Sequence, residues 1–202
     1  MPSLSPLRAL SAACALLAAA SLRTGVDVEI PSAGGCWDPG SRHLCLDAWQ
    51  IADKNATFDV TCDPGAGGPA LAWCAFGFNV QIPSPRVWGM APSEIIFLSV
   101  LSSGEVVVED RVAPTAAKPA CFSRQLTYLV KGAVDASGVL RATVTRPVFL
   151  DASLLALGYT DLNRTVPTVA AYNSGSDRQT VSCSSSINYH TNQWSNRTIA
   201  FL

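Results

Sequence analysis

The chain has 202 residues, of which 49% are hydrophobic and only 14% charged, and its formal net charge is −1. This length suits one domain with a substantial core, and this composition argues against a disordered chain. The near-neutral charge and the lack of any basic run argue against a nucleic-acid-binding protein.

The first segment has the pattern of a secretory leader. An apolar run from Ala9 to Ala20 follows Arg8 and ends in three alanines. This pattern predicts a signal peptide over residues 1–20 and one mature domain over residues 21–202. A buried N-terminal helix or a membrane anchor is the alternative. Because no later run of 18 apolar residues occurs, we expect a mature chain without a transmembrane segment, secreted to the extracellular space.

Short β-rich runs follow, and none has a sustained helical period. The run at 70–78 is dense in aromatic and small apolar residues. The runs at 94–101 and 105–112 flank a Ser-Ser-Gly turn at 102–104 and predict a hairpin. The runs at 124–135 and 138–148 flank a second tight turn.

The last third of the chain continues this pattern. Residues 150–159 predict a short helix or turn, and the runs at 166–173 and 197–202 predict further strands. Short strands without intervening helices indicate an all-β antiparallel sandwich or barrel, with its core within about residues 36–202.

Cysteines and glycosylation sequons agree with secretion. Six of the seven cysteines follow the leader, and an even number in a secreted chain predicts disulfides. Cys36 and Cys45 flank a short loop and are the first predicted pair. A structural zinc site is the alternative, disfavoured because no Cys-x-x-Cys pair occurs. Asn55, Asn163 and Asn196 begin Asn-x-Thr sequons and are predicted glycosylation sites.

Several catalytic chemistries lack their residues. The chain has two histidines, His43 and His190, too few for most metallohydrolase or multi-histidine copper sites. It has no Gly-x-Ser-x-Gly elbow, phosphate-binding loop or dinucleotide motif. Glu109 and Asp110 are adjacent on a predicted strand and would point to opposite faces. A non-catalytic electron-transfer or ligand-binding domain is therefore favoured over an autonomous enzyme.

Three motifs in order carry a family resemblance. They are Trp73-x-Ala75-x-Gly77-Phe78, the segment from Met90 to Ser93, and Tyr189-His190 near the end. Together with the stretch at 46–62, their order resembles the extracellular DOMON family. The match is to the haem-binding branch found in cytochrome domains of cellobiose dehydrogenase and in plant auxin-responsive cytochromes.

The resemblance implies an immunoglobulin-like β-sandwich that holds one b-type haem. It implies that Met90 and His190 are the axial ligands of the haem iron, brought together by loops at one end of the sandwich. Such ligation leaves no open position on the iron and suits one-electron transfer with an extracellular redox partner. Without a Cys-x-x-Cys-His motif, the haem is expected to be held non-covalently. Phe76, Trp88 and Tyr189 are candidate walls of the haem pocket.

Two alternatives stay open. The first is a haem-free module that binds carbohydrate or protein, as some DOMON domains do, because Pro92 stands where the family tends to have glycine. The second alternative concerns His43, which lies between two cysteines. We expect it to be an exposed loop residue, and it is the other candidate for the histidine ligand of the haem iron.

Overall fold

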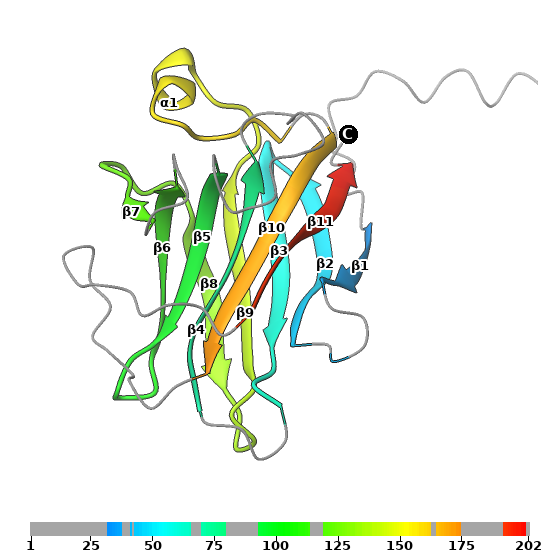
Figure 1. Cartoon of the computed structure of the whole chain (residues 1–202). Coiled ribbons are helices and arrows are strands. Elements are labelled where there is room, and N and C mark those ends of the chain that lie inside the picture. The colour runs from blue at the N-terminus through cyan, green and yellow to red at the C-terminus, as the bar shows by residue number, and fades with distance from the viewer. Residues whose placement is uncertain are drawn as a thin grey trace, which may run out of the picture.

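We describe a computed structural model of the chain. It describes residues 32–37, 41, 43–65, 70–79, 93–113, 119–162, 165–174 and 192–200. Within these residues, eleven strands and one short helix form a two-layer antiparallel sandwich (Figure 1). The predicted all-β sandwich is confirmed. None of the described helices is long and apolar enough to cross a membrane.

The first layer is a five-stranded sheet. In spatial order it contains β1 (Ser32–Cys36), β2 (Leu44–Ala52), β3 (Asn55–Cys62), β9 (Leu140–Pro147) and β8 (Tyr128–Val134). β3 alternates between exposed or half-exposed and buried positions along its whole length. That period of two is expected for a strand with one face on the core and one face toward solvent.

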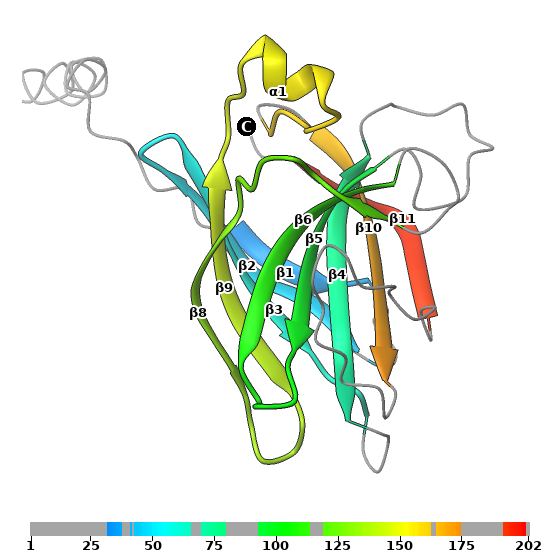
Figure 2. The same ribbon diagram turned by 90° about the vertical axis from the view of Figure 1, so that its left-hand side faces the viewer.

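The second layer is a six-stranded sheet, whose strands β6, β5, β4, β10 and β11 are seen side by side in Figure 2. In spatial order it contains β11 (Asn192–Ala200), β10 (Thr165–Ser174), β4 (Leu71–Asn79), β5 (Ser93–Val100), β6 (Val106–Ala113) and β7 (Ala120–Cys121). The helix α1 (Ala152–Ala156) lies beyond one end of the sandwich, where the side chain of Asp151 caps its first turn.

The predicted hairpins are observed. β5 and β6 are joined through Ser102–Gly104, and Gly104 has a φ of 87°, which glycine adopts without strain. β8 and β9 form the second hairpin, and α1 lies within the predicted helical segment at 150–159. β11 begins at Asn192, five residues earlier than the predicted strand at 197–202.

Aromatic side chains fill the space between the two sheets. The ring centroids of Phe58 and Phe76 lie 5.6 Å apart, and those of Phe58 and Phe78 lie 5.8 Å apart. Trp37 packs near Phe76 and donates its indole N–H to Oγ1 of Thr168 at 3.0 Å. These contacts couple β3 to β4, and they couple Trp37, which follows β1, to β4 and β10.

A buried ion pair crosses the same core. Arg146 of β9 donates to Glu94 of β5, and both side chains are fully buried. The second carboxylate oxygen of Glu94 accepts from the N–H of Thr160 at 2.7 Å, and Arg146 donates to the carbonyl of Thr160 at 2.8 Å. Burial raises the pKa of Glu94, while the guanidinium of Arg146 opposes that rise.

Disulfides add covalent ties. The predicted Cys36–Cys45 bond is confirmed and joins register partners on β1 and β2. A second bond, Cys62–Cys74, joins β3 of the five-stranded sheet to β4 of the six-stranded sheet. Cys121 is also disulfide-bonded.

The ion pair predicts an asymmetric stability response. Arg146→Leu leaves the Glu94 carboxylate buried without its cation, so we expect the free energy of unfolding to fall by about 3–5 kcal/mol. The double substitution Glu94→Leu/Arg146→Met removes both charges. It should lower the free energy of unfolding by less than Arg146→Leu does. Urea denaturation measures both. A double variant less stable than Arg146→Leu would contradict this account.

The third disulfide can be assigned by peptide mapping. Beyond Cys121 and the two bonded pairs, the sequence contains Cys14 and Cys183. Because Cys14 lies in the predicted signal peptide, we expect a Cys121–Cys183 bond in the secreted protein. Non-reducing digestion and mass spectrometry should recover that linked peptide pair, and a free thiol at Cys183 would refute it.

Candidate functional site: the outer face of the six-stranded sheet

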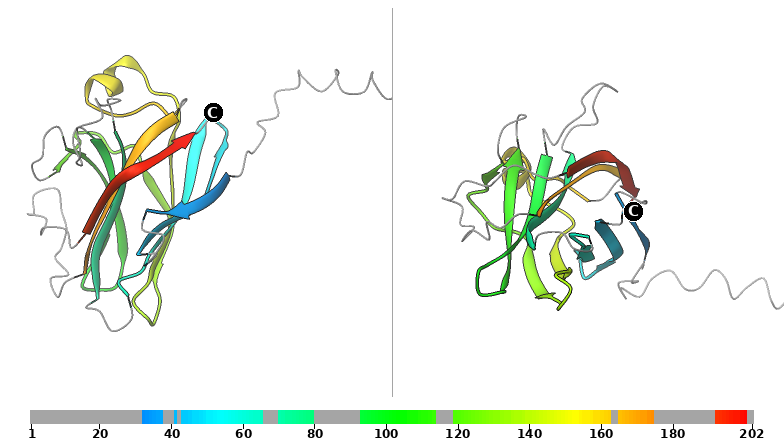
Figure 3. Two further views of the ribbon diagram at one scale, coloured as in Figure 1. Left: turned by 45° about the vertical axis from the view of Figure 1, so that its right-hand side comes forward. Right: turned by 60° about the horizontal axis from the view of Figure 1, so that its bottom comes forward.

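The two outer faces of the sandwich differ in burial. A sandwich sheet ordinarily turns one face to the core and the other to solvent. β3 follows this rule, but every residue of β4 and β5 is buried. The outward side of the six-stranded sheet is therefore shielded along its two central strands. Among the described residues no strand or helix packs over it (Figure 3).

The strand register shows which residues share this outward side. Ala171 of β10, Ala75 of β4 and Phe97 of β5 lie in one cross-strand row. The neighbouring rows add Trp73 beside Ser99 and Gly77 beside Ile95. We call these seven residues the outer apolar face. All seven are buried. Gly77 is buried within β4, and the other six have at most 5% of their surface exposed: Ala171, Ala75, Phe97, Trp73, Ile95 and Ser99.

Small side chains in the middle of this face leave a flat floor bounded by aromatic rings. Ala75, Gly77 and Ala171 project little from the sheet, while the rings of Trp73 and Phe97 lie 4.8 Å apart between centroids. Glycine is required at position 77, because an added Cβ would lie 2.1 Å from the carbonyl oxygen of Glu94. This arrangement suits a flat apolar ligand better than a polar one.

One buried cation adjoins the face. The guanidinium carbon of Arg111, on β6, lies 4.8 Å from the ring centroid of Phe97, and its side chain is 2% exposed. Glu109 accepts from Nη2 of Arg111 at 2.5 Å, and Nη1 donates to the carbonyl of Pro119 at 3.4 Å. The face therefore carries a paired, desolvated charge at its β6 border.

Polar atoms on the same side lack partners. The indole N–H of Trp73 and the hydroxyls of Ser93 and Ser99 are buried without a hydrogen bond to any described residue. An unsatisfied buried donor or acceptor costs about 1–3 kcal/mol. A group bound over this face with a few polar positions would give these three atoms partners. The face is therefore compatible with a macrocycle that carries polar substituents, such as haem.

The sequence-predicted site residues divide between the described and undescribed parts of the chain. Met90, His190, Trp88 and Tyr189 all lie outside the described residues. Phe76, the fifth candidate, is buried in the core between the sheets, and its side chain points away from the outer apolar face.

The strands that flank the two candidate ligands enter the sheet from opposite ends. Met90 precedes β5, whose first residue Ser93 pairs with Asn79 at the end of β4. His190 precedes β11, whose first residue Asn192 aligns through Tyr172 with Cys74, five residues back along β4. The two entry points lie roughly 17 Å apart along the strands and about 14 Å across three strand spacings, or about 22 Å overall.

The expectation that loops bring both ligands together at one end of the sandwich concerns segments outside the described residues, and the structure places only the strands that flank them. The segment with Met90 follows β4 and the segment with His190 follows β10. Because β4 and β10 are antiparallel neighbours, the chain leaves them at opposite ends.

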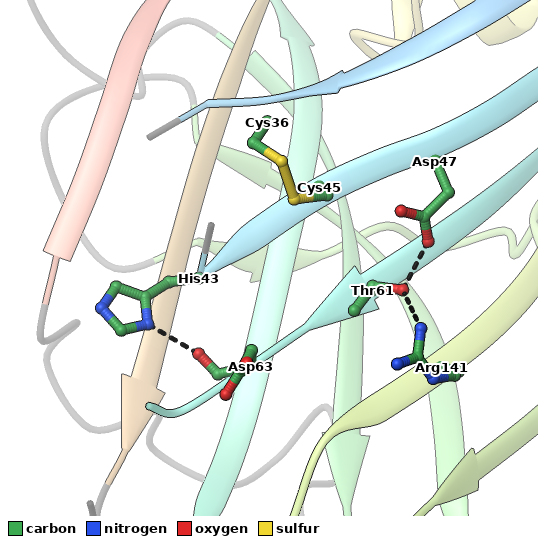
Figure 4. Close-up of a disulfide and its surroundings, with 7 residues drawn as sticks. All are labelled: Cys36, His43, Cys45, Asp47, Thr61, Asp63 and Arg141. Carbon is green, nitrogen blue, oxygen red and sulfur yellow. Dashed lines mark hydrogen bonds between the residues drawn. A yellow bond between two sulfur atoms is a disulfide. The ribbon is translucent and has the colours of Figure 1, made fainter. Parts of the chain in front are cut away.

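His43 has the surroundings of a structural residue. Its Nδ1 lies 2.7 Å from the carbonyl oxygen of Asp63 (Figure 4). The centroid of its ring lies 5.1 Å from that of Tyr172. It is half-buried rather than exposed as predicted, because the turn at Gly65 lies against it. Within the described residues no group of three or more His, Cys, Asp or Glu side chains could hold a metal ion.

Asn55 is exposed at the start of β3, as a glycosylation site requires. Asn163 lies outside the described residues. Asn196 lies within β11, and its side chain is not described.

Comparison with known proteins identifies the fold. The chain is similar to the cytochrome b domain of pyranose dehydrogenase from Coprinopsis cinerea, with a TM-score of 0.54 and 8% identity over 86% of this chain and 81% of that one. It is also similar to the cytochrome domain of Myriococcum thermophilum cellobiose dehydrogenase, with a TM-score of 0.52 and 11% identity over 89% of each chain. No family model and no curated protein matches the sequence.

These likenesses define the class of fold. The chain has the β-sandwich of cytochrome b domains, the architecture that the DOMON resemblance implies.

The burial of the outer apolar face predicts a contrast between two glutamate substitutions. Ala75→Glu places a charge on this face, and we expect the free energy of unfolding to fall by at least about 3 kcal/mol. Thr145→Glu places the same charge on the half-exposed outer side of the five-stranded sheet and should cost less than about 1 kcal/mol. Urea denaturation compares them, and equal losses would show that the two faces are equally solvated.

Proposed function

We propose that this chain is a secreted b-type cytochrome domain that transfers single electrons, with its haem over the outer apolar face. The observation that carries the proposal is the composition of that face, which is made largely of apolar and small side chains where the outer side of a sandwich sheet is ordinarily polar. The shared fold of the two cytochrome domains supports it. The disulfides support an oxidising, extracytoplasmic compartment.

Met90 and His190 are the proposed axial ligands. An iron held by methionine and histidine has no open coordination position, so the group would supply electron transfer rather than oxygen or substrate activation. Trp73 and Phe97 would contact the macrocycle from the sheet side. Ala75, Gly77 and Ala171 leave room for it because they project so little.

Chain reach is compatible with this ligand pair. Met90 stands three residues before Ser93 and His190 two residues before Asn192, so extended backbone spans at most about 10 Å and about 7 Å. Together they cover roughly 17 Å of the roughly 22 Å between the two entry points. Two side chains and the iron between them can cover the rest. The pair would then meet over the middle of the sheet, above the outer apolar face.

The proposed partners are an extracellular electron donor and acceptor. A domain of this kind needs no catalytic residues of its own, in agreement with the missing hydrolase and transferase motifs. Its reactivity would be set by the ligands and by access of the partner to the edge of the haem.

A haem titration tests the ligands. The purified protein should bind haem and, when reduced, show the sharp Soret and α bands of a low-spin iron. Met90→Ala and His190→Ala should each weaken haem binding or convert the iron to high spin, because each removes one strong axial ligand.

The matched control is His43→Ala, which removes the other histidine of the chain. It should leave the low-spin spectrum unchanged. Wild-type protein that takes up no haem would end the proposal. A His43→Ala variant that loses the spectrum while His190→Ala keeps it would move the ligand to His43.

A further inference from the structure

The strand β1 lies at the edge of the five-stranded sheet, and its composition is poor for a strand. Its sequence is Ser-Ala-Gly-Gly-Cys, so two of its five residues are glycine. Glycine weakens a strand because it brings no side chain to pack and loses more conformational freedom on folding than other residues do. β1 also pairs on one side only, with β2. Backbone pairing alone therefore holds this strand weakly.

Two ties at the C-terminal end of β1 add to this pairing. Cys36, its last residue, is disulfide-bonded to its register partner Cys45 on β2. Trp37, the next residue, is 2% exposed and belongs to the core between the sheets. The other four residues of β1 have no side chain larger than that of serine. The disulfide is therefore the tie that joins the strand itself to its neighbour.

The Cys36–Cys45 disulfide lies on the outer side of the five-stranded sheet. Leu44 and Leu46, the two neighbours of Cys45, belong to the core between the sheets, so the side chain of Cys45 points the other way. Its register partner on β3 is Thr61, beside which Figure 4 shows the disulfide. The bond is thus on the side of the sheet that faces solvent, and at the edge of that sheet.

The two sulfur atoms differ in access. Cys36 is half-buried and lies on the edge strand, whereas Cys45 is 3% exposed and lies between β1 and β3. A disulfide is opened by a thiolate that attacks one of its sulfurs, and access decides which sulfur is attacked. Sγ of Cys36 is therefore the point of attack, and Cys45 is the leaving group.

The Cys62–Cys74 disulfide has the opposite surroundings. Both of its cysteines are fully buried in the core, where the bond joins β3 of one sheet to β4 of the other. A thiolate cannot reach this bond without separating the two sheets. The folded protein thus contains one accessible and one inaccessible disulfide.

We propose that the Cys36–Cys45 disulfide is a thiol-exchange site at which an external dithiol releases β1 from the sandwich. A thiolate of the dithiol attacks Sγ of Cys36, the S–S bond breaks, and Cys45 leaves as a thiolate that takes up a proton. The second thiolate of the reductant then attacks the reductant's own sulfur in the mixed disulfide, and Cys36 leaves and is protonated. The protein gains two electrons and two protons, and the dithiol becomes a disulfide.

The structure also defines how far the opening extends. Trp37 keeps its hydrogen bond to Oγ1 of Thr168, at 3.0 Å, and its contact with Phe76, because neither involves a cysteine. The residues of β1 before Trp37 lose their covalent tie and keep only the weak pairing with β2. Their release uncovers the backbone N–H and C=O groups of β2, which then becomes the edge strand of the sheet.

Differential alkylation of the folded, full-length protein tests the site of attack. The protein is treated with dithiothreitol without denaturant, alkylated at successive times and mapped by mass spectrometry. We expect Cys36 and Cys45 to be labelled at least about tenfold faster than Cys62 and Cys74, because exchange follows access to the sulfur. The buried pair is the matched control within the same molecule.

Hydrogen–deuterium exchange tests the release of β1. In the reduced and alkylated protein, the amides of β1 should exchange about tenfold faster or more than in the oxidised protein, because local opening now needs no broken covalent bond. Amides of β3 and β9 should exchange alike in both forms. The double substitution Cys36→Ser/Cys45→Ser should show the same pattern, which assigns the change to the lost bond rather than to the alkyl groups.

Two results would overturn the proposal. One is labelling of Cys62 and Cys74 in the folded protein as fast as that of Cys36 and Cys45. The other is equal protection of the β1 amides in the oxidised and reduced forms. Both measurements use the wild-type chain, so they decide the matter even where the double variant fails to fold. Neither needs haem, so their outcome is independent of the proposed electron-transfer function.

Discussion

The buried pair of Arg146 and Glu94 constrains how the two sheets can sit on one another. Removing each charge from water costs several kcal/mol, which only close pairing and complete hydrogen bonding offset. Glu94 meets this need through Arg146 and the N–H of Thr160, and Arg146 through Glu94 and the carbonyl of Thr160. A shift of β5 by one residue would turn Glu94 outward and Ile95 inward. The pair therefore fixes which residues of β5 form the outer apolar face.

Local signals in the sequence predicted a glycine-containing hairpin and a short-range disulfide. They did not predict a hairpin without glycine or a disulfide between the two sheets. The Ser102–Gly104 turn marked the β5–β6 hairpin because glycine supplies the positive φ. The β2–β3 hairpin turns through Asp53 and Lys54, which have positive φ without glycine, and no strand was predicted on either side. Likewise the Cys36–Cys45 bond follows from a short spacing. The Cys62–Cys74 bond joins different sheets, which spacing alone does not reveal.

The same limit applies to the sites. The nine residues of β4 contain no charge and no alternation, which is typical of a strand buried on both faces, so the outer apolar face had a readable signal. The motif Trp73-x-Ala75-x-Gly77 supplies that face, with Phe78 on the core side. The outer side of the five-stranded sheet had no comparable signal, because only the pairing of β3 with β9 brings Asp59 beside Thr143.

The two outer faces of the sandwich differ in composition, and the core separates them. Packed sheets lie about 10 Å apart, so side chains on one outer face make no contact with those on the other. What connects them is the ion pair. Arg146 follows Thr145 on the outer side of the five-stranded sheet, while Glu94 precedes Ile95 of the outer apolar face. The same buried charges therefore hold both strands in place, and the geometry of each outer face depends on this pair.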